Sequence, residues 1–513
     1  MRSASRWPNA DPFAVTRSAL SDTAAACHPT FAALRRAERL AYTRGMSRES
    51  ALASARQAFD GGRLFADLAR RVAYRTESQN PARAAELDRY LQEEIGPAFT
   101  RMGFAVDVIA NPVAGGGPFL LATRDEDPTL PTVLGYGHAD VIRGLEPQWR
   151  AGLDPWTLTV DGERWYGRGT ADNKGQHTVN LLALQTVIAT RGRLGFNARY
   201  LIETGEEIGS PGLAELCEGH KTRLAADLLI ASDGPRVAPE RPTVFTGSRG
   251  AMNVDLVVTL REGAHHSGNW GGLLANPGVI LAHALASIIG ADGRVSVREL
   301  VPESIAPAIR EALIDCAPDA REGPAIDAGW GEPGLSAAEK VYGWSTFEVL
   351  AFRTGNPDNP VNAIPATAVA HCQIRYTVDV DPATFVPALR RHLDAHGFDK
   401  VAVVPAREGS FTATRLDPRH PAAQWAADSI ARTTGKKPAR LPNIGGSLPN
   451  DCFADVLGMP TLWVPHSYAG CSQHAPNEHA LAPVLREGLE MMTGLYWDLG
   501  ETPPARTGRF VPS

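Results

Sequence analysis

Cysteine is scarce in this sequence of 513 residues, and no two cysteines form a Cys-x-x-Cys pair. A disulfide framework or a thiolate zinc site is therefore not expected, and we predict isolated reduced thiols at Cys27, Cys217, Cys316, Cys372, Cys452 and Cys471. No stretch approaches the roughly 20 apolar residues that cross a bilayer, and the first residues lack the apolar core of a secretory signal. These absences argue against a membrane partner and predict a cytoplasmic protein.

The sequence also has no excess of positive charge. Its net charge is −6, and its lysines and arginines are scattered, so it has no electrostatic footprint for nucleic acid. A hydrophobic fraction of 43% with 21% charged residues is typical of a soluble globular protein, and the length predicts about two or three folded units. No internal repeat is present.

Residues 1–45 form a polar, alanine-rich leader without recognisable chemistry. Between residues 47 and 102, apolar residues recur at three- and four-residue steps, which predicts helices that cover a sheet. Apolar runs at 104–109, 119–123 and 132–137 then predict strands.

Acidic and histidine residues follow several of the predicted strands. His138 and Asp140 come at the end of the run 132–137, where Asp140 can accept a hydrogen bond from one ring nitrogen and direct the other toward a metal. A hydrogen-bonded surface pair is the alternative. Asp172 falls between the Gly167-Arg-Gly169 loop and an amphipathic run, so it is either a metal ligand or a helix cap.

Glu206 and Glu207 stand in a glycine-flanked turn after the apolar run 200–202, and Asp233 ends the run 226–231. Each could be a solvated acidic turn. However, parallel strands bring their carboxyl ends to one edge of a sheet, so several such residues on successive strands predict one constellation there.

From about residue 246 the pattern changes. Strands are predicted at 253–260, 366–378 and 400–405, helices at 277–289 and 382–396, and a helical insertion of uncertain shape between 296 and 340. This order predicts a separate sandwich of strands and helices inserted into the first domain. His266 lies in a glycine-rich loop and Arg375 on the long strand, and both could be ordinary surface residues.

The last hundred residues return to the first pattern, with a helix at 422–433 and a strand at 460–465. Gly445, Gly446 and Ser447 could offer backbone N–H groups to an anion. His474 completes a set of two imidazoles and three carboxylates, which suits a pair of divalent ions: His138, Asp172, Glu207, Asp233 and His474. Zinc is favoured, and manganese or cobalt also fit. Such a pair activates a bridging water, and Glu206 is placed to take its proton.

Eight motifs, in order, resemble the signatures of the M20 metallopeptidase family. They are His138-Ala-Asp140, Gly167-Arg-Gly with Asp172-Asn-Lys-Gly, Thr204-Gly-Glu-Glu, Asp233-Gly, His266-Ser-Gly with Gly271-Gly, Asn362-Ala-Ile-Pro, Gly445-Gly-Ser and His474-Ala-Pro-Asn-Glu. The resemblance implies an α/β catalytic domain of the zinc-exopeptidase type, with a mixed sheet flanked by helices and an inserted α+β sandwich lid through which many members dimerise. The expected parts are an N-terminal extension at 1–60, the catalytic domain at 61–245 and 409–513, and the lid at 246–408.

The resemblance also implies roles for individual residues. His138 and Asp233 would bind one ion, Glu207 and His474 the other, and Asp172 both, with Glu206 as general base and Asp140 orienting His138. The bond between Asp172 and Asn173 is expected to be cis. His266 would reach the site of a partner subunit, and the carboxylate end of the substrate would be bound by Arg375, Asn362, Gly445, Gly446 and Ser447.

Within the family, the long lid and the His266-Ser-Gly-Asn-Trp-Gly-Gly stretch are similar to the carnosinase-related dipeptidases. We therefore expect a homodimeric hydrolase that cleaves dipeptides or similar short substrates with a free carboxylate. The alternative is an N-acyl amino acid deacylase on the same scaffold, because the metal centre recognises only an amide. A non-catalytic binding protein is disfavoured, since all five ligands and the base are present.

Overall fold

The computed structural model describes residues 46–321, 323–406 and 411–504. Contacts divide the chain into two compact units, Met1–Met46 and Ser47–Ser513, and every element named below belongs to the second. The expected leader at 1–45 and Cys27 lie outside the described residues. The other five cysteines are buried and free, in agreement with the prediction. No described helix combines the length and apolar character needed to span a membrane.

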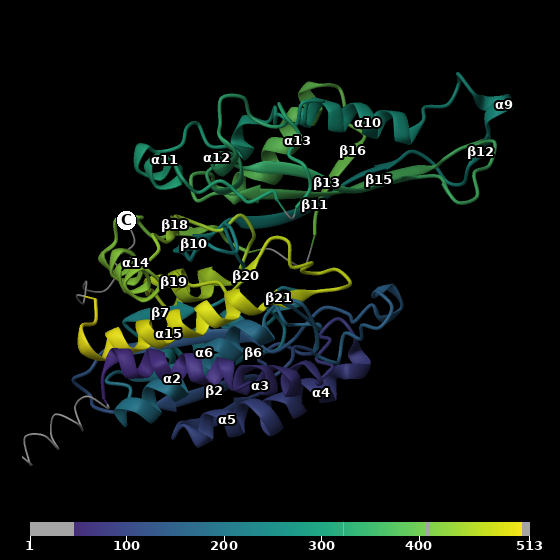
Figure 1. Ribbon diagram of the computed structural model, residues 1–513. Coiled ribbons are helices and arrows are strands. Elements are labelled where there is room, and N and C mark those ends of the chain that lie inside the picture. Colours follow the sequence, from purple (N-terminus) through teal and green to yellow (C-terminus); the bar gives the residue numbers. More distant parts are fainter. Residues whose placement is uncertain (1–45, 322, 407–410, 505–513) are drawn as a thin grey trace, which may run out of the picture. The chain divides into compact units, whose positions relative to one another are not determined.

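An eight-stranded mixed sheet forms the centre of the catalytic domain (Figure 1). Its strands, in spatial order, are β1 (Ala105–Ile109), β2 (Phe119–Arg124), β6 (Asn197–Glu203), β3 (Thr132–His138), β7 (Leu228–Ala231), β19 (Thr461–Trp463), β9 (Thr243–Phe245) and β18 (Ala439–Leu441). Neighbours from β6 to β19 are parallel, whereas the pairs β1–β2 and β2–β6 are antiparallel. The carboxyl ends of β3, β6 and β7 therefore share one edge, as predicted.

Helices cover both faces of this sheet, because successive residues of a buried strand point to opposite sides. On β6, Tyr200 and Ile202 join one core cluster and Leu201 joins the other. The first cluster includes residues of α2 (Arg48–Asp60), α3 (Arg63–Val72), α5 (Gly96–Arg101), α6 (Lys174–Arg191), α14 (Pro421–Thr434) and α15 (Ala482–Glu501). The second includes residues of α7 (Leu213–Gly219). The predicted helices between 47 and 102 are thus present, with α4 at Ala84–Arg89 and a π-helical segment at Tyr90–Ile95.

Helix α2 falls inside the segment 1–60 that the sequence assigned to an extension. Its Ala51 and Ala55 are fully buried, and the helix contacts α15 and α6 (Figure 1). Residues from Ser47 onward therefore contribute to the core of the catalytic domain.

A second, antiparallel sheet lies in the insertion, which we call the lid domain (residues 250–405). Its strands, in spatial order, are β13 (Thr346–Thr354), β15 (Thr367–Tyr376), β11 (Gly250–Thr259) and β16 (Val401–Pro405). Helices α10 (Pro277–Ile288) and α13 (Phe385–Ala395) pack on one face, over Ala370, Cys372 and Ile374 of β15. The three strands and two helices predicted here are present, and β13 is a further strand that the sequence had not located.

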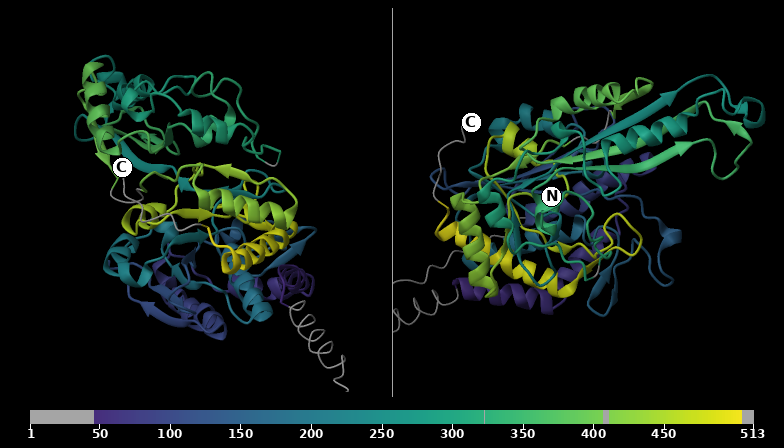
Figure 2. Two further views of the ribbon diagram at one scale, coloured as in Figure 1. Left: turned by 90° about the vertical axis from the view of Figure 1, so that its left-hand side faces the viewer. Right: turned by 90° about the horizontal axis from the view of Figure 1, so that it is seen from above.

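Between α10 and β13, the described residues of the expected helical insertion form two short α-helices, α11 (Pro307–Leu313) and α12 (Ala337–Tyr342), and a 3-10 segment, Arg298–Leu300, joined by loops. At its other end the lid domain carries a small two-stranded antiparallel sheet of β12 (His265–His266) and β14 (Ala363–Ile364), with the single turn α9 (Ser267–Trp270). Figure 1 shows β12 and α9 beyond the end of the long lid strands, and the same projection is visible in Figure 2. We call residues 265–270 and 361–364 the lid tip.

Candidate metal centre

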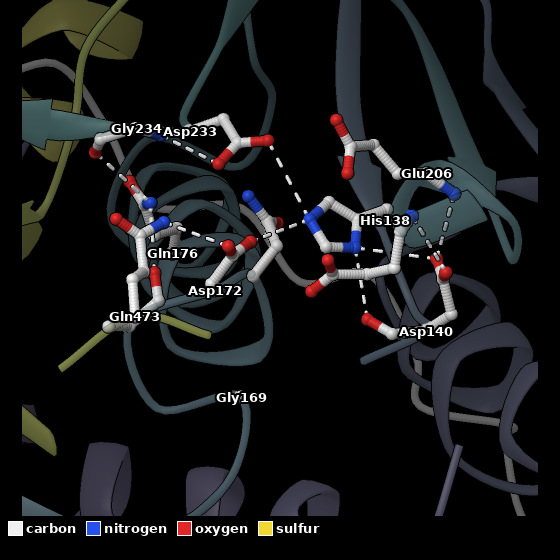
Figure 3. A network of polar contacts seen from close by, with 12 residues as sticks. His138, Asp140, Gly169, Asp172, Gln176, Glu206, Asp233, Gly234 and Gln473 are labelled. Atoms are coloured by element: carbon white, nitrogen blue, oxygen red, sulfur yellow. Dashed lines mark hydrogen bonds and ion pairs between the residues drawn. The ribbon is translucent and has the colours of Figure 1, made fainter. Parts of the chain in front are cut away.

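His138 is the last residue of β3 and is completely buried. Its Nδ1 lies 3.0 Å from the main-chain carbonyl oxygen of Asp140 and 3.4 Å from the Asp140 carboxylate. Since a carbonyl only accepts, Nδ1 carries the proton and Nε2 presents a lone pair. Nε2 lies 2.8 Å from Oδ1 of Asp172 and 3.7 Å from Oδ2 of Asp233 (Figure 3). The sequence assigned this orienting contact to the Asp140 side chain, whereas its main-chain carbonyl is closer.

The carboxylate of Asp140 holds the turn that carries the two adjacent glutamates. Its oxygens accept hydrogen bonds from the backbone N–H groups of Glu206, at 3.2 Å, and Glu207, at 3.1 Å (Figure 3). The turn is a single 3-10 segment, Glu206–Ile208, and it closes at Gly209, whose φ of 88° favours glycine. Asp140 thus links the end of β3 to the turn after β6, a role that the sequence analysis did not foresee.

Asp172 stands just before α6 and lies between both histidines. Its Oδ1 faces His138, while its Oδ2 is 3.1 Å from Nε2 of His474 and accepts a hydrogen bond from Gln473 at 2.8 Å. The peptide bond between Asp172 and Asn173 is cis, as expected. His474 Nε2 is also 3.0 Å from Oε2 of Glu207.

The carboxylate of Glu478 holds the backbone of the loop that ends in Asp172. The sequence analysis left Glu478 without a role. Its buried carboxylate accepts hydrogen bonds from the backbone N–H groups of Gly169, Ala171 and Asp172 at 2.9–3.1 Å. It also pairs at 2.8 Å with the equally buried Arg168. The two residues belong to the motifs Gly167-Arg-Gly and His474-Ala-Pro-Asn-Glu. Their opposite charges were the one feature of the sequence that could have indicated this ion pair.

Asp233 follows β7 and is buried. Its Oδ1 accepts a hydrogen bond from the N–H of Gly234, but its Oδ2 is buried without a hydrogen-bond partner among the described residues. An unpartnered carboxylate oxygen is costly in a protein interior unless a cation compensates it. The free oxygen and the nearby Nε2 of His138 therefore fit a metal ion.

The acidic groups of this cluster shift the pKa values of one another. Burial, together with the charge of Asp172, raises the pKa of Glu207 to about 7 and that of Asp233 to about 6. Burial also raises the pKa of Glu206 well above its usual range, and Asp233 and Glu207 add to this rise. Hydrogen bonds that His474 donates to the carboxylates of Asp172 and Glu207 raise its pKa to about 11. So many carboxylates in one buried place indicate a site built for cations.

The donor atoms also have the spacing that a metal requires. One ligand atom each from His138, Asp172 and Glu207 lie within 4.8 Å of one another. Asp233 contacts His138, and His474 contacts both Asp172 and Glu207. The structure therefore brings all five sequence-predicted ligands to the shared edge of β3, β6 and β7, with Glu206 beside them. Oxygen and imidazole donors in this mixture suit zinc, manganese or cobalt.

A cleft of about 760 Å³ opens over the cluster, a volume typical of small-molecule sites. Asp172, Glu206, Glu207, Asp233 and His474 line it. Its lining also includes four of the predicted substrate-binding residues, Arg375, Gly445, Gly446 and Ser447, together with Asn253 and Gln373. Arg375 donates to Ser447 Oγ at 2.7 Å, and Ser447 donates to the carbonyl of Arg249 at 2.7 Å.

His266 and Asn362 are the two predicted site residues that lie elsewhere. Both are exposed at the lid tip, where the carbonyl of Asn362 accepts a hydrogen bond from Ser267 N at 2.8 Å. Neither lines the cleft.

Comparisons with known proteins agree with this geometry. Residues 134–498 match peptidase family M20/M25/M40. The chain is 26% identical over 421 residues to the β-Ala-His dipeptidase of Rattus norvegicus, covering 77% of this chain and 82% of that protein. It is 26% identical over 351 residues to the cysteinylglycine-S-conjugate dipeptidase of Corynebacterium striatum, covering 67% and 75%.

Among solved structures, human carnosine dipeptidase 1 resembles the chain with a TM-score of 0.73 at 21% identity, covering 89% of this chain and all (100%) of that one. This likeness concerns the fold, including the lid domain. The sequence match over residues 134–498 includes all five predicted ligands. The chain belongs to peptidase family M20/M25/M40 and is a metallopeptidase.

Proposed function

We propose that this protein hydrolyses the amide bond of dipeptides, or of similar short substrates with a free carboxylate, by using two divalent metal ions and Glu206 as general base. One observation carries the proposal. Four of the five predicted ligands line the same cleft as Glu206, Arg375 and Ser447, and the fifth, His138, contacts Asp172 and Asp233. A short substrate in this cleft can thus present its amide to the ligands and its carboxylate to Arg375.

His138 and Asp233 would hold one ion, and Glu207 and His474 the other, with one oxygen of Asp172 toward each. The two oxygens of Asp172 support this division, because Oδ1 faces His138 and Oδ2 faces His474. When bound, such a pair of ions lowers the pKa of a water molecule between them and stabilises negative charge on the attacked carbonyl. Zinc is the first choice of metal, with manganese or cobalt as alternatives.

Glu206 would take the proton of the attacking water and deliver it to the leaving amine. Its backbone is fixed by Asp140, so its carboxylate stays next to the ligands without being required as one. Burial and neighbouring carboxylates raise its pKa, which increases its basicity and favours proton transfer in both directions.

Arg375 would bind the carboxylate of the substrate. Among the described residues it has no ion-pair partner, and burial lowers its pKa, so a negative group in the cleft would relieve an uncompensated charge. Ser447 and the backbone of Gly445 and Gly446 add hydrogen-bond donors on the same wall.

The exposed lid tip supports a homodimer in which His266 acts in the partner's cleft. The outer strand of the lid sheet, β13, presents Val349, Leu350 and Phe352 with exposed fractions of 42%, 60% and 42%. An edge strand with apolar side chains and unpaired backbone groups is typical of a surface that pairs with another chain. Docking through β13 would bury this strand, and His266 would complete the partner's site.

The dipeptidase proposal is preferred to a deacylase because the similar proteins named above are dipeptidases. The test is elemental analysis of protein purified without added metal, with panels of dipeptides and N-acyl amino acids assayed before and after chelation. We expect about two equivalents of metal and chelator-sensitive cleavage of dipeptides. Faster cleavage of N-acyl amino acids would favour the deacylase, and failure to bind zinc, manganese and cobalt would refute the metal centre.

A further inference from the structure

The lid domain contains a second cavity, with a volume of about 590 Å³, beside the cleft. The two share Pro318 and Val341 as lining residues, but none of the predicted metal ligands lines the second cavity, and Arg375 does not line it either. Its walls are aromatic and apolar: Trp344 and Phe347 are buried, whereas Trp330 and Ile326 are exposed. We call it the lid cavity.

Trp330 is held in place although half of it is exposed. Its ring packs against Gly293 so closely that a side chain at this glycine would come within 2.5 Å of the ring. Lys340 Nζ donates to its carbonyl oxygen at 2.5 Å, and the next residue, Gly331, donates to the carbonyl of Asp292 at 2.6 Å. A tryptophan fixed at three points forms a rigid wall, which lowers the entropic cost of binding a ligand.

Arg249 brings a buried positive charge to the lid cavity. It is only 8% exposed, and its guanidinium donates to two carbonyl oxygens, that of Gly445 at 2.7 Å and that of Trp344 at 3.3 Å. No carboxylate among the described residues forms a direct ion pair with it. Burial, with a contribution from the charge of Arg375, lowers its pKa to about 10 against the opposing charge of Glu348, which also lines the cavity, so Arg249 remains a cation at neutral pH. A buried cation without a direct ion pair fits an anionic ligand.

Two further polar atoms of the lining lack partners. Oε2 of Glu332 and Oγ of Ser345 are buried and have no hydrogen-bond partner among the described residues. The other oxygen of Glu332 is 3.5 Å from Arg294. Buried polar groups are normally satisfied, so these two atoms are available to a ligand in the cavity. A free carboxylate oxygen fits an ammonium group, which complements the anion site at Arg249.

We propose that the lid cavity binds a free α-amino acid with an aromatic or large apolar side chain. Arg249 binds its carboxylate, Glu332 binds its ammonium group, and the side chain lies among Trp330, Trp344 and Phe347. Arg249 also donates a hydrogen bond to the carbonyl oxygen of Gly445, which lines the cleft where the substrate carboxylate is proposed to bind. A ligand bound to Arg249 would therefore act on the position of this part of the cleft. Binding in the lid cavity itself does not depend on the proposed catalytic function.

The test is calorimetric titration of the metal-loaded protein with L-phenylalanine, N-acetyl-L-phenylalanine and 2-phenylethylamine. Arg375→Ala is used as the background, because it weakens binding of carboxylates in the cleft. We expect saturable binding of L-phenylalanine, and binding at least about tenfold weaker for the two analogues, each of which lacks one charge. Similar binding of all three compounds would overturn the proposal.

Two variants locate the binding. Trp330→Ala and Glu332→Gln should each weaken L-phenylalanine binding by at least about tenfold. Trp270→Ala, which changes a tryptophan of similar exposure at the lid tip, should have no effect. Circular dichroism verifies that each variant is folded. If L-phenylalanine binds the protein with native Arg375 but does not bind Arg375→Ala, the lid cavity is not the site. The same conclusion follows if folded Trp330→Ala and Glu332→Gln bind L-phenylalanine as tightly as the Arg375→Ala background.

Discussion

Two carboxylates of the centre act through backbone groups rather than through a metal. Asp140 holds the N–H groups of Glu206 and Glu207, and Glu478 holds three N–H groups of the loop that ends in Asp172. The proposed general base and the proposed bridging ligand are therefore both positioned by buried acids from other segments. Hydrogen bonds of this kind fix the orientation of metal ligands, so their loss weakens metal binding or activity.

Glu206→Gln is expected to lower kcat by at least about 100-fold, because the amide cannot accept the proton of water. Metal content and the circular dichroism spectrum should stay unchanged, since Glu206 is not required as a ligand. The matched variant Glu207→Gln alters the neighbouring ligand and should reduce metal content as well. A Glu206→Gln enzyme with nearly native turnover would remove Glu206 from the role of base.

Glu478→Gln should destabilise the protein by about 3–5 kcal/mol, because it leaves the buried Arg168 without its carboxylate. Denaturant unfolding of the metal-free protein measures this change. The control is Asp161→Asn, which breaks the ion pair between Asp161 and Arg150. Both side chains of this pair are more than half exposed, so the variant should lower the free energy of unfolding by less than about 1 kcal/mol. Equal effects of the two variants would contradict the supporting role of Glu478.

At the scale of elements, the lid tip and β13 expose side chains that the proposed dimer would bury. Leu350→Glu on β13 should produce a monomer of unchanged secondary structure with strongly reduced turnover, because a charge on the exposed apolar strand opposes pairing. Light scattering after size exclusion measures the mass. Val160→Glu, at a similarly exposed apolar residue of β4 (Thr159–Asp161), serves as control. A native enzyme that is already monomeric and active would refute the proposed dimer.

His266→Ala should lower turnover with little loss of metal. If His266 acts in the partner's cleft, mixing inactive His266→Ala with inactive Glu206→Gln should restore part of the activity. In such a mixed dimer, one cleft has an intact Glu206 and receives an intact His266. Activity measured after dissociation and reassociation tests this. No recovery, with mixed dimers verified by mass spectrometry, would place His266 outside the reaction.

At the scale of the whole molecule, the metal centre joins segments that are far apart in the sequence. Its ligands come from the ends of β3 and β7, the loops before α6 and after β6, and a loop near the C-terminus. Metal binding should therefore stabilise the whole catalytic domain. At a free zinc concentration 100 times Kd, the gain should be about 2.7 kcal/mol for one site. Calorimetric Tm values with and without chelator measure it, and Asp172→Asn should reduce the gain. An unchanged Tm of the native protein would contradict this coupling.

Sequence patterns alone predicted the strands that end in acidic residues, the helices between 47 and 102 and most elements of the lid. These are local patterns, because periodicity depends on neighbouring residues and the carboxyl ends of parallel strands must share an edge. The motifs around His138, Asp172 and Glu206 also indicated the family. The strand β13, with its bulge and many exposed residues, lacked a clear alternating pattern and was not located.

Which groups support the proposed ligands, and which lie apart from them, follows from the folded chain rather than from local sequence. The contacts of Asp140 with Glu206, and of Glu478 with Gly169, join residues separated by 66 and 309 positions, and no local pattern encodes such distances. The lid cavity has the same origin. Among the described residues, Arg249 has no ion-pair partner and one oxygen of Glu332 has no hydrogen-bond partner because of how the chain packs around them. Packing depends on long-range contacts that a sequence pattern does not specify.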